Sequence, residues 1–234
     1  MSLEPIGRRL RAATRPACVA LVAIGSVLFG LQPAEAQPAS VTKIKYYTVE
    51  ASTAQSLDQQ MIARGPIHGR GRAYANIVAK PDYSGQLVQG QSCRLEDFTV
   101  RAEFTMTLPK LGAGAKLSPD LKARWESFQA FVRRHEEGHR DIWIDTMRKA
   151  EQRISALRAP TCQQLQGMID GAFQEEWRVG ERRQDAYDRA DQQKLVRHPL
   201  IQAASAARRK MGAALAPPSA QSPVMGRIRG HAVR

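Results

Sequence analysis

The segment SPDLKARWESFQAFVRRHEEGHRDI (118–142) has the pattern of a long amphipathic helix. Ser118 is a favourable N-cap, and Pro119 suits the first helical position because its fixed φ is helical and its missing N–H would have no partner there. Large apolar residues then recur at intervals of four and three residues, at Leu121, Trp125, Phe128 and Val132. This periodicity predicts a helix from Pro119 to about Leu157 with one buried stripe.

A His-Glu-x-x-His motif lies inside this helix, at residues 135–139. Histidines four residues apart share a helix face, so His135 and His139 can bind one Zn²⁺ ion, and Glu136 can take a proton from the water that zinc activates. The apolar spacing continues through both histidines, which predicts that they lie on the buried stripe, and Gly138 is expected to leave room beside the metal. The competing interpretation is a pair of core histidines in a charged helix.

A catalytic zinc ion needs a third protein ligand in addition to its water. A second helix is expected over residues 161–192, and its acidic side chains are the natural source of that ligand. Four residues are candidates, namely Glu176, Asp188, Asp191 and His198. Helical phase does not choose between them, because the three acids fall on or at the edge of the apolar face and the histidine follows the helix.

The part of the chain before these helices is typical of β-structure. Strands are expected over 41–50, 73–79 and 94–108, and the last of these alternates between apolar and polar residues as a half-buried strand does. A short helix is expected over 52–62. Strands followed by helices predict an α+β fold, with an N-terminal β-sheet and a short helix before two long helices.

The first 36 residues have the order of a secretory signal peptide. Four arginines precede an apolar run at 18–31, which is shorter than the roughly 20 residues that span a bilayer. A small-x-small sequence, Ala34-Glu35-Ala36, follows. Cleavage after Ala36 is expected to leave no transmembrane anchor and a secreted or periplasmic chain that starts at Gln37, whereas an uncleaved membrane anchor is the alternative.

The chain has three cysteines, and Cys18 would leave with the signal peptide. The remaining pair, Cys93 and Cys162, is expected to form a disulfide, because exported proteins fold in an oxidising compartment. Two free buried thiols are the alternative. A cysteine zinc site is not expected, because no CxxC spacing is present.

The net charge of +13 points at first to a polyanion partner. Most of it lies outside the central part of the chain, however. The signal peptide carries a net +2, and residues 194–234 carry eight basic residues and no acid, which leaves +3 for 37–193. Residues 194–234 are predicted to be a basic, disordered tail that contacts an anionic envelope surface, although a short helix over 200–214 is also compatible with the sequence. No specific nucleic-acid partner is expected, because no aromatic residues alternate with the basic ones.

Four stretches of the sequence resemble a bacterial family called domain of unknown function 922, whose members are described as predicted secreted zinc-dependent proteases of the zincin type. The stretches are YYTVEASTAQSLDQQMIARGP (46–66), CRLEDFTVRAEFTMTLPKL (93–111), RHEEGHRDI (134–142) and QDAYDRA (184–190). The resemblance implies a zincin-like metallopeptidase domain over 37–193. It implies His135 and His139 as zinc ligands and Glu136 as the catalytic base.

The family has a late motif that reads approximately Tyr-Asp-x-x-Thr-x-His-Gly. Tyr187 and Asp188 match it, whereas Asp191, Gln193 and Lys194 stand at the expected Thr, His and Gly positions. If the motif's histidine is the third zinc ligand, this chain must replace it. Asp188 is then the first choice, and Glu176, Asp191 and His198 remain alternatives.

Three classes of function follow from these patterns. The first is a secreted zinc metallopeptidase that hydrolyses bonds in a peptide or protein substrate. The second is a non-catalytic envelope scaffold or binding protein that retains a zincin fold. The third is a polyanion-binding protein that acts through its basic tail.

Overall fold

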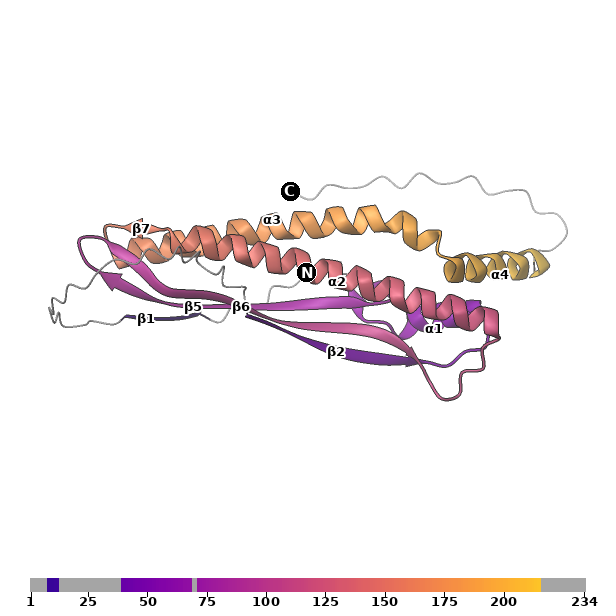
Figure 1. Cartoon of the computed structure of the whole chain (residues 1–234). Coiled ribbons are helices and arrows are strands. Elements are labelled where there is room, and N and C mark those ends of the chain that lie inside the picture. The colour runs from indigo at the N-terminus through magenta and orange to yellow at the C-terminus, as the bar shows by residue number, and fades with distance from the viewer. Residues whose placement is uncertain (1–7, 13–38, 69–70, 216–234) are drawn as a thin grey trace, which may run out of the picture.

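The computed structural model describes residues 8–12, 39–68 and 71–215 (Figure 1). The chain forms a mixed β-sheet and four helices in this part, so the predicted α+β class is confirmed. In chain order the elements are β1 (Arg8–Ala12), β2 (Ala39–Val49), α1 (Ala54–Arg64), β3 (Ile67–His68), β4 (Gly71–Arg72), β5 (Asn76–Gln89), β6 (Cys93–Leu111), α2 (Pro119–Ser155), β7 (Arg158–Ala159), α3 (Cys162–Val196) and α4 (Pro199–Leu215).

The main sheet has the strand order β1-β5-β6-β2, and β7 pairs with the start of β6. The β5–β6 hairpin is antiparallel, whereas β2 runs parallel to β6 and β1 runs parallel to β5. The second predicted strand proves longer than expected, because β5 continues past Pro81 to Gln89 with a bulge between Ser84 and Gln86. Proline cannot donate a backbone hydrogen bond to a neighbouring strand, so it is tolerated where a strand edge is unpaired. Among the described residues, β1 pairs only with Tyr83–Leu87, so the edge of β5 away from β6 is unpaired at Pro81.

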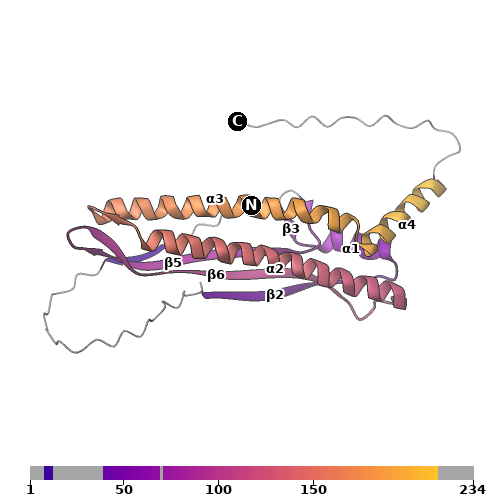
Figure 2. The ribbon, with the colours of Figure 1, turned by 45° about the horizontal axis from the view of Figure 1, so that its top comes forward.

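The long helices α2 and α3 run side by side over one face of the sheet (Figure 2). The alternation of β6 explains this arrangement, since the side chains on its apolar face are buried under the helices: Phe98, Val100, Ala102, Phe104, Met106 and Leu108. The intervening residues, such as Arg101 and Glu103, are exposed on the opposite face. The fold therefore has two layers, a β-sheet and a layer of helices that covers one of its faces, and the helical layer carries the predicted motif.

Local capping explains where both long helices begin. The Ser118 side chain accepts the Leu121 backbone N–H at 3.4 Å, and the Thr161 side chain accepts the Gln164 N–H at 3.2 Å. Each bond satisfies one of the orphan amides of a helix N-terminus. Both helices therefore start where the sequence predicts, and α3 continues to Val196, past the expected end at Gln192.

The core has two parts, one at each end of the helical layer. One part surrounds the start of β6 and the stacked pair Trp143 and Trp177, whose ring centroids are 4.0 Å apart. The other packs the first half of α2, including Trp125, against α1, the end of β6 and α4. Residues 133–142 of α2 lie between the two parts, so packing holds this segment of the helix from both sides.

The predicted disulfide between Cys93 and Cys162 is present, with the two Cα atoms 5.0 Å apart. It joins the first residue of β6 to the first residue of α3, beside the pairing of β7 with β6. Because disulfides persist in oxidising compartments, the bond indicates an extracytoplasmic protein.

Replacing both cysteines by serine is expected to lower the free energy of unfolding by about 4 kcal/mol, because the bond closes a long loop in the unfolded chain. The sequence separation of 69 residues sets this scale. Urea unfolding of the double variant measures the change, and reducing agent added to the unchanged protein should reproduce it. Equal unfolding midpoints with and without the bond would contradict the prediction.

The C-terminal part differs from the predicted disordered tail over 194–215. Residues 194–196 complete α3, and α4 covers the segment in which a short helix was also compatible with the sequence. The physical reason is burial: Leu200 and Ile201 pack into the core on the α1 side, and Ala204 is fully buried as well. A composition rich in Ala and basic residues concealed this apolar face. Residues 216–234 lie outside the described part of the chain.

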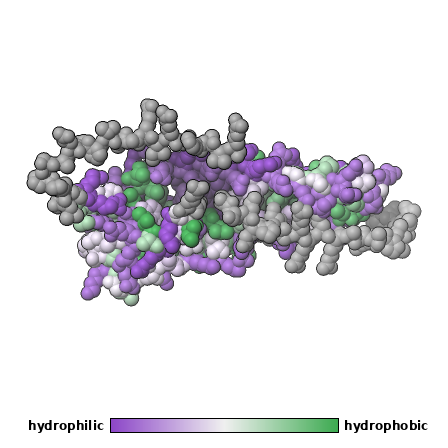
Figure 3. All heavy atoms as spheres, turned by 180° about the vertical axis from the view of Figure 1, so that it is seen from behind, coloured by the Kyte–Doolittle hydropathy of each residue, from purple (hydrophilic) through white to green (hydrophobic). Residues whose placement is uncertain are grey.

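Most of the predicted signal peptide, including the cleavage site after Ala36, also lies outside the described residues. Its residues 8–12 form β1. Over the described ranges, no helix combines the length and the apolar character needed to cross a bilayer. Seen from behind, the described surface is mostly hydrophilic, with hydrophobic residues in separate patches (Figure 3).

Candidate metal centre

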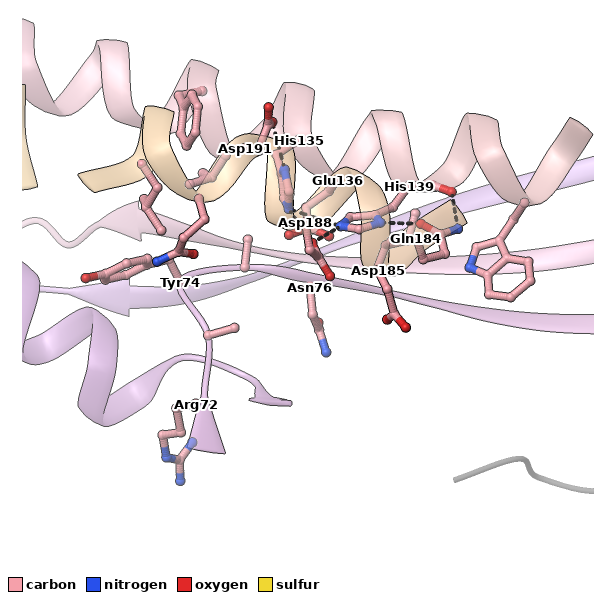
Figure 4. A pocket seen from close by; sticks show the side chains of 18 residues that line it. Arg72, Tyr74, Asn76, His135, Glu136, His139, Gln184, Asp185, Asp188 and Asp191 are labelled. Atoms are coloured by element: carbon pink, nitrogen blue, oxygen red, sulfur yellow. Dashed lines mark hydrogen bonds and ion pairs between the residues drawn. The ribbon is translucent and has the colours of Figure 1, made fainter. Parts of the chain in front are cut away.

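Three side chains from the two long helices converge on one point (Figure 4). His135 and His139 come from α2, and Asp188 comes from the facing turn of α3. The two histidine Nε2 atoms are 3.0 Å apart, and Asp188 Oδ1 lies 3.2 Å from the first and 2.9 Å from the second. These three residues form a group that could hold a metal ion. The structure thus brings the predicted pair of histidines together with the first choice for a third ligand.

Hydrogen bonds behind the histidines determine which ring nitrogen faces the centre. His135 Nδ1 lies 3.0 Å from Asp191 Oδ2, and His139 Nδ1 contacts Gln184 Oε1. Gln184 is itself oriented by its Nε2, which donates to the backbone carbonyl of His139 at 2.9 Å. An acceptor beside each Nδ1 favours a proton there, so that both Nε2 atoms present lone pairs to the centre.

The donor set fits a cation. Two Nε2 lone pairs and a carboxylate oxygen at about 3 Å would repel one another without a positive charge between them. Tetrahedral bonds of about 2.0–2.1 Å to a metal would place ligand atoms roughly 3.3 Å apart, close to these separations. Burial disfavours the charged imidazoles and is the largest single effect on their pKa. The hydrogen bonds to Asp188, to Asp191 for His135 and to Gln184 for His139, together with nearby carboxylate charge, outweigh it, so the pKa of each histidine is raised above the ordinary value.

Glu136 lies beside this group and is almost fully buried, with 4% of its surface exposed. Burial raises the pKa of its carboxyl group to about 7, although the two neighbouring histidines lower it. The carboxylate accepts a hydrogen bond from the backbone N–H of Ile77, which fixes it against strand β5. Glu136 is therefore placed to hold or accept a proton next to the centre.

The prediction that both histidines lie on the buried stripe of α2 needs correction. Glu136 occupies the buried position, while His135 and His139 are half-buried beside it, with 21% and 12% of their side chains exposed. The apolar stripe resumes at Trp143. The exposed parts of these two imidazole rings therefore face the pocket, as a metal ligand requires and a core residue does not.

Tyr187 is a site residue whose role the sequence reasoning missed. Its ring stacks on His135 at 5.0 Å with an interplanar angle of 14°, and it meets His139 edge to face. It also occupies the space that Gly138 was expected to leave open, since a Cβ atom at Gly138 would lie 2.3 Å from the Tyr187 hydroxyl oxygen. The match of Tyr187 to the family's late motif was the one signal that could have identified it.

The structure gives the alternative ligands other roles. Glu176 pairs with Arg153 at 2.9 Å, and Asp191 supports His135 and binds Lys194 at 2.6 Å. His198 caps α4, because its Nδ1 accepts the Leu200 backbone N–H at 3.3 Å.

Gln193, at the expected position of the family's histidine, is exposed and does not line the pocket. The geometry of this site therefore does not depend on a ligand at that position.

A cavity of about 450 Å³ opens in front of the centre. One wall is the segment 72–77, and α2 and α3 form the others. Apolar and aromatic residues line the cavity beyond the ligands, among them Phe131, Val132 and Leu195. A ligand could therefore place a polar group at the centre and an apolar group beside it.

The fold and the site define a two-layer α+β protein with a candidate His-His-Asp metal centre. The chain belongs to the family of bacterial proteins of unknown function (DUF922), whose model matches residues 44–194, more than half of its length. The match contains every residue of the centre and ends before α4. No curated protein and no solved structure matches the chain.

Proposed function

We propose that this protein is a zincin-type zinc metallopeptidase that hydrolyses bonds in a peptide or protein substrate. The observation that supports the proposal most strongly is the buried carboxylate of Glu136, which lies beside the His135, His139 and Asp188 group in an open cavity. A purely structural metal site is normally closed by four protein ligands and needs no neighbouring base.

Zinc is the metal that this donor set favours. Two imidazole nitrogens and one carboxylate oxygen are the ligands of several catalytic zinc sites, in which the fourth position stays open for water or substrate. When bound, Zn²⁺ supplies a Lewis acid that polarises a carbonyl group and acidifies a water molecule. The apolar side of the cavity would hold a side chain of the substrate next to the bond to be cleaved.

The residues of the chain would supply the remaining chemistry. Glu136 accepts a proton from the attacking water and returns it to the leaving amine, the two roles of a general base and then a general acid. The Ile77 N–H holds the carboxylate in place. Asp191 and Gln184 orient the two imidazoles, and Tyr187 packs against both rings.

We further propose that the mature chain starts after Ala36 and acts as a secreted or periplasmic protein. The disulfide supports this location. The exposed Arg209 and Lys210 on α4, together with the basic residues that follow, would contact an anionic envelope surface. The non-catalytic scaffold is the competing function, and the experiment below distinguishes it.

The substitution Glu136→Gln is expected to abolish hydrolysis while leaving zinc content and melting temperature unchanged, because glutamine keeps the shape of the side chain but cannot accept the proton. General base catalysis contributes about 10²- to 10⁴-fold, which sets the expected loss. Zinc content is measured by elemental analysis of the purified mature chain, and activity with fluorescein-labelled casein.

Glu137→Gln is the matched control, because Glu137 is the adjacent acid of the motif but does not line the cavity. It should retain activity. If the protein without substitutions binds zinc stoichiometrically but cleaves none of a panel of unfolded protein substrates, the result would support the non-catalytic scaffold function instead. Full activity in Glu136→Gln would refute the assigned role of Glu136.

A further inference from the structure

Asp58 of α1 is a buried charged residue outside the metal centre, with none of its surface exposed. Both of its carboxylate oxygens have partners. Oδ1 accepts a hydrogen bond from the Tyr74 hydroxyl at 2.6 Å, and Oδ2 accepts one from Arg208 Nη1. A buried carboxylate is costly unless it is paired and hydrogen-bonded. The position of Asp58 therefore depends on both partners.

Tyr74 links this carboxylate to the wall of the cavity. It belongs to the segment 72–77, which faces the metal centre, and its side chain extends away from the centre (Figure 4). Three contacts hold it: the bond to Asp58, an edge-to-face contact with Phe128 at 5.4 Å, and a hydrogen bond from the Tyr47 hydroxyl to its backbone carbonyl at 2.7 Å. Tyr74 thus anchors segment 72–77, whose Ile77 N–H binds Glu136.

Arg208 comes from α4, which lies beyond the part of the chain that the family model matches. This helix packs beside α1 at the end of the helical layer (Figures 1 and 2). Its apolar face anchors it through Leu200 and Ala204, which are fully buried. Arg208 is about two turns further along the helix, where it reaches the single buried acid of α1.

We propose that α4 positions the cavity wall, with Arg208 as the positioning residue that acts through Asp58 and Tyr74. Arg208 neutralises Asp58, Asp58 holds the Tyr74 hydroxyl, and Tyr74 holds segment 72–77 opposite the metal ligands. Arg208 itself touches no residue of the centre. The inference concerns the cavity of the proposed function, but it can be tested without any catalytic activity.

Hydrogen–deuterium exchange on the full mature chain tests this inference. In Arg208→Ala, the amides of 73–77 are expected to exchange about tenfold faster or more, the scale set by losing a hydrogen bond to a charged group. Zinc content should stay unchanged, because no metal ligand is altered. Arg208→Lys should restore slow exchange, since Asp58 Oδ2 accepts only one bond from this side chain.

Arg209→Ala is the matched control, because this exposed neighbour on the same helix should leave the exchange at 73–77 unchanged. The double variant Asp58→Asn, Arg208→Ala removes the unpaired charge and is expected to slow the exchange again relative to Arg208→Ala. Faster exchange confined to α1 and α4, or an equal effect of Arg209→Ala, would overturn the proposal.

The same variants separate this proposal from the proposed function. If the unsubstituted chain hydrolyses casein, Arg208→Ala should raise KM, because the wall binds substrate. It should also lower kcat, because the loosened segment contains the Ile77 N–H that holds Glu136. A chain without peptidase activity that still shows the exchange pattern would refute the proposed function alone. An active peptidase whose wall exchange does not respond to Arg208 would refute the role of α4 alone.

Discussion

Replacing Asp188 by alanine is expected to remove the metal from the purified protein. Among the described residues, Asp188 is the one member of the candidate metal group that comes from α3, and its Oδ1 lies about equally far from the two histidine Nε2 atoms, at 3.2 Å and 2.9 Å. Its loss leaves two neutral imidazoles on a single helix. Removing a residue that hydrogen-bonds to a ligand and orients it lowers metal affinity by about 10- to 100-fold. Removing a ligand itself should lower the affinity by more. Elemental analysis after dialysis measures the result, and His135→Ala should behave in the same way.

The alternative ligands provide the controls for this experiment. Glu176→Ala and His198→Ala should keep a full complement of metal, because these residues bind Arg153 and cap α4. Asp191→Ala should weaken binding by about 10- to 100-fold, as expected for a residue that orients a ligand. Full metal content in Asp188→Ala, or its loss in Glu176→Ala, would show that the third ligand is assigned wrongly.

Replacing Gly138 by alanine is expected to disrupt the centre as well, although Gly138 binds nothing. A Cβ atom there would lie 2.3 Å from the Tyr187 hydroxyl oxygen and 2.5 Å from Cζ, closer than real atoms approach. The ring cannot shift freely, because it stacks on His135. Displacing it should move that imidazole and reduce metal affinity by about 10- to 100-fold, as for other residues that orient a ligand. Zinc titration and thermal unfolding measure the two effects.

Gly171→Ala is the matched control for this substitution. Gly171 lies within α3, and a Cβ atom there would have no neighbour within 4 Å. Alanine should therefore stabilise the protein by about 0.5–1 kcal/mol through helix propensity alone and leave metal affinity unchanged. Unaltered metal affinity in Gly138→Ala would show that Tyr187 does not hold the ligand in place.

Local patterns were sufficient to predict most elements of this fold. The N-caps Ser118 and Thr161 begin the helices because a side-chain oxygen satisfies a nearby amide, and the period-two alternation of 94–108 predicts a strand with one buried face. These interactions span only a few residues, so they can be recognised in the sequence. The disulfide followed from counting cysteines in an exported chain.

The same local reasoning was misleading for α4. Its composition is rich in Ala and basic residues, which is typical of a tail, but Leu200, Ile201 and Ala204 bury one face against distant parts of the chain. Its Arg208 also pairs with an acid 150 residues earlier. Neither interaction is visible within the segment, because both depend on the surface that α1 and α2 present to it.

The sequence by itself determined that one helix carries two histidines and a glutamate in the arrangement of a metal site, because four residues make about one helical turn. Only the tertiary structure decided which acid completes the site. That choice depends on how far α3 is shifted and rotated against α2, which is set where Trp177 stacks on Trp143 and where Gly180 lets Trp143 approach its backbone. Eight residues beyond Gly180, Asp188 then faces the histidines, while Asp191 lies behind one of them.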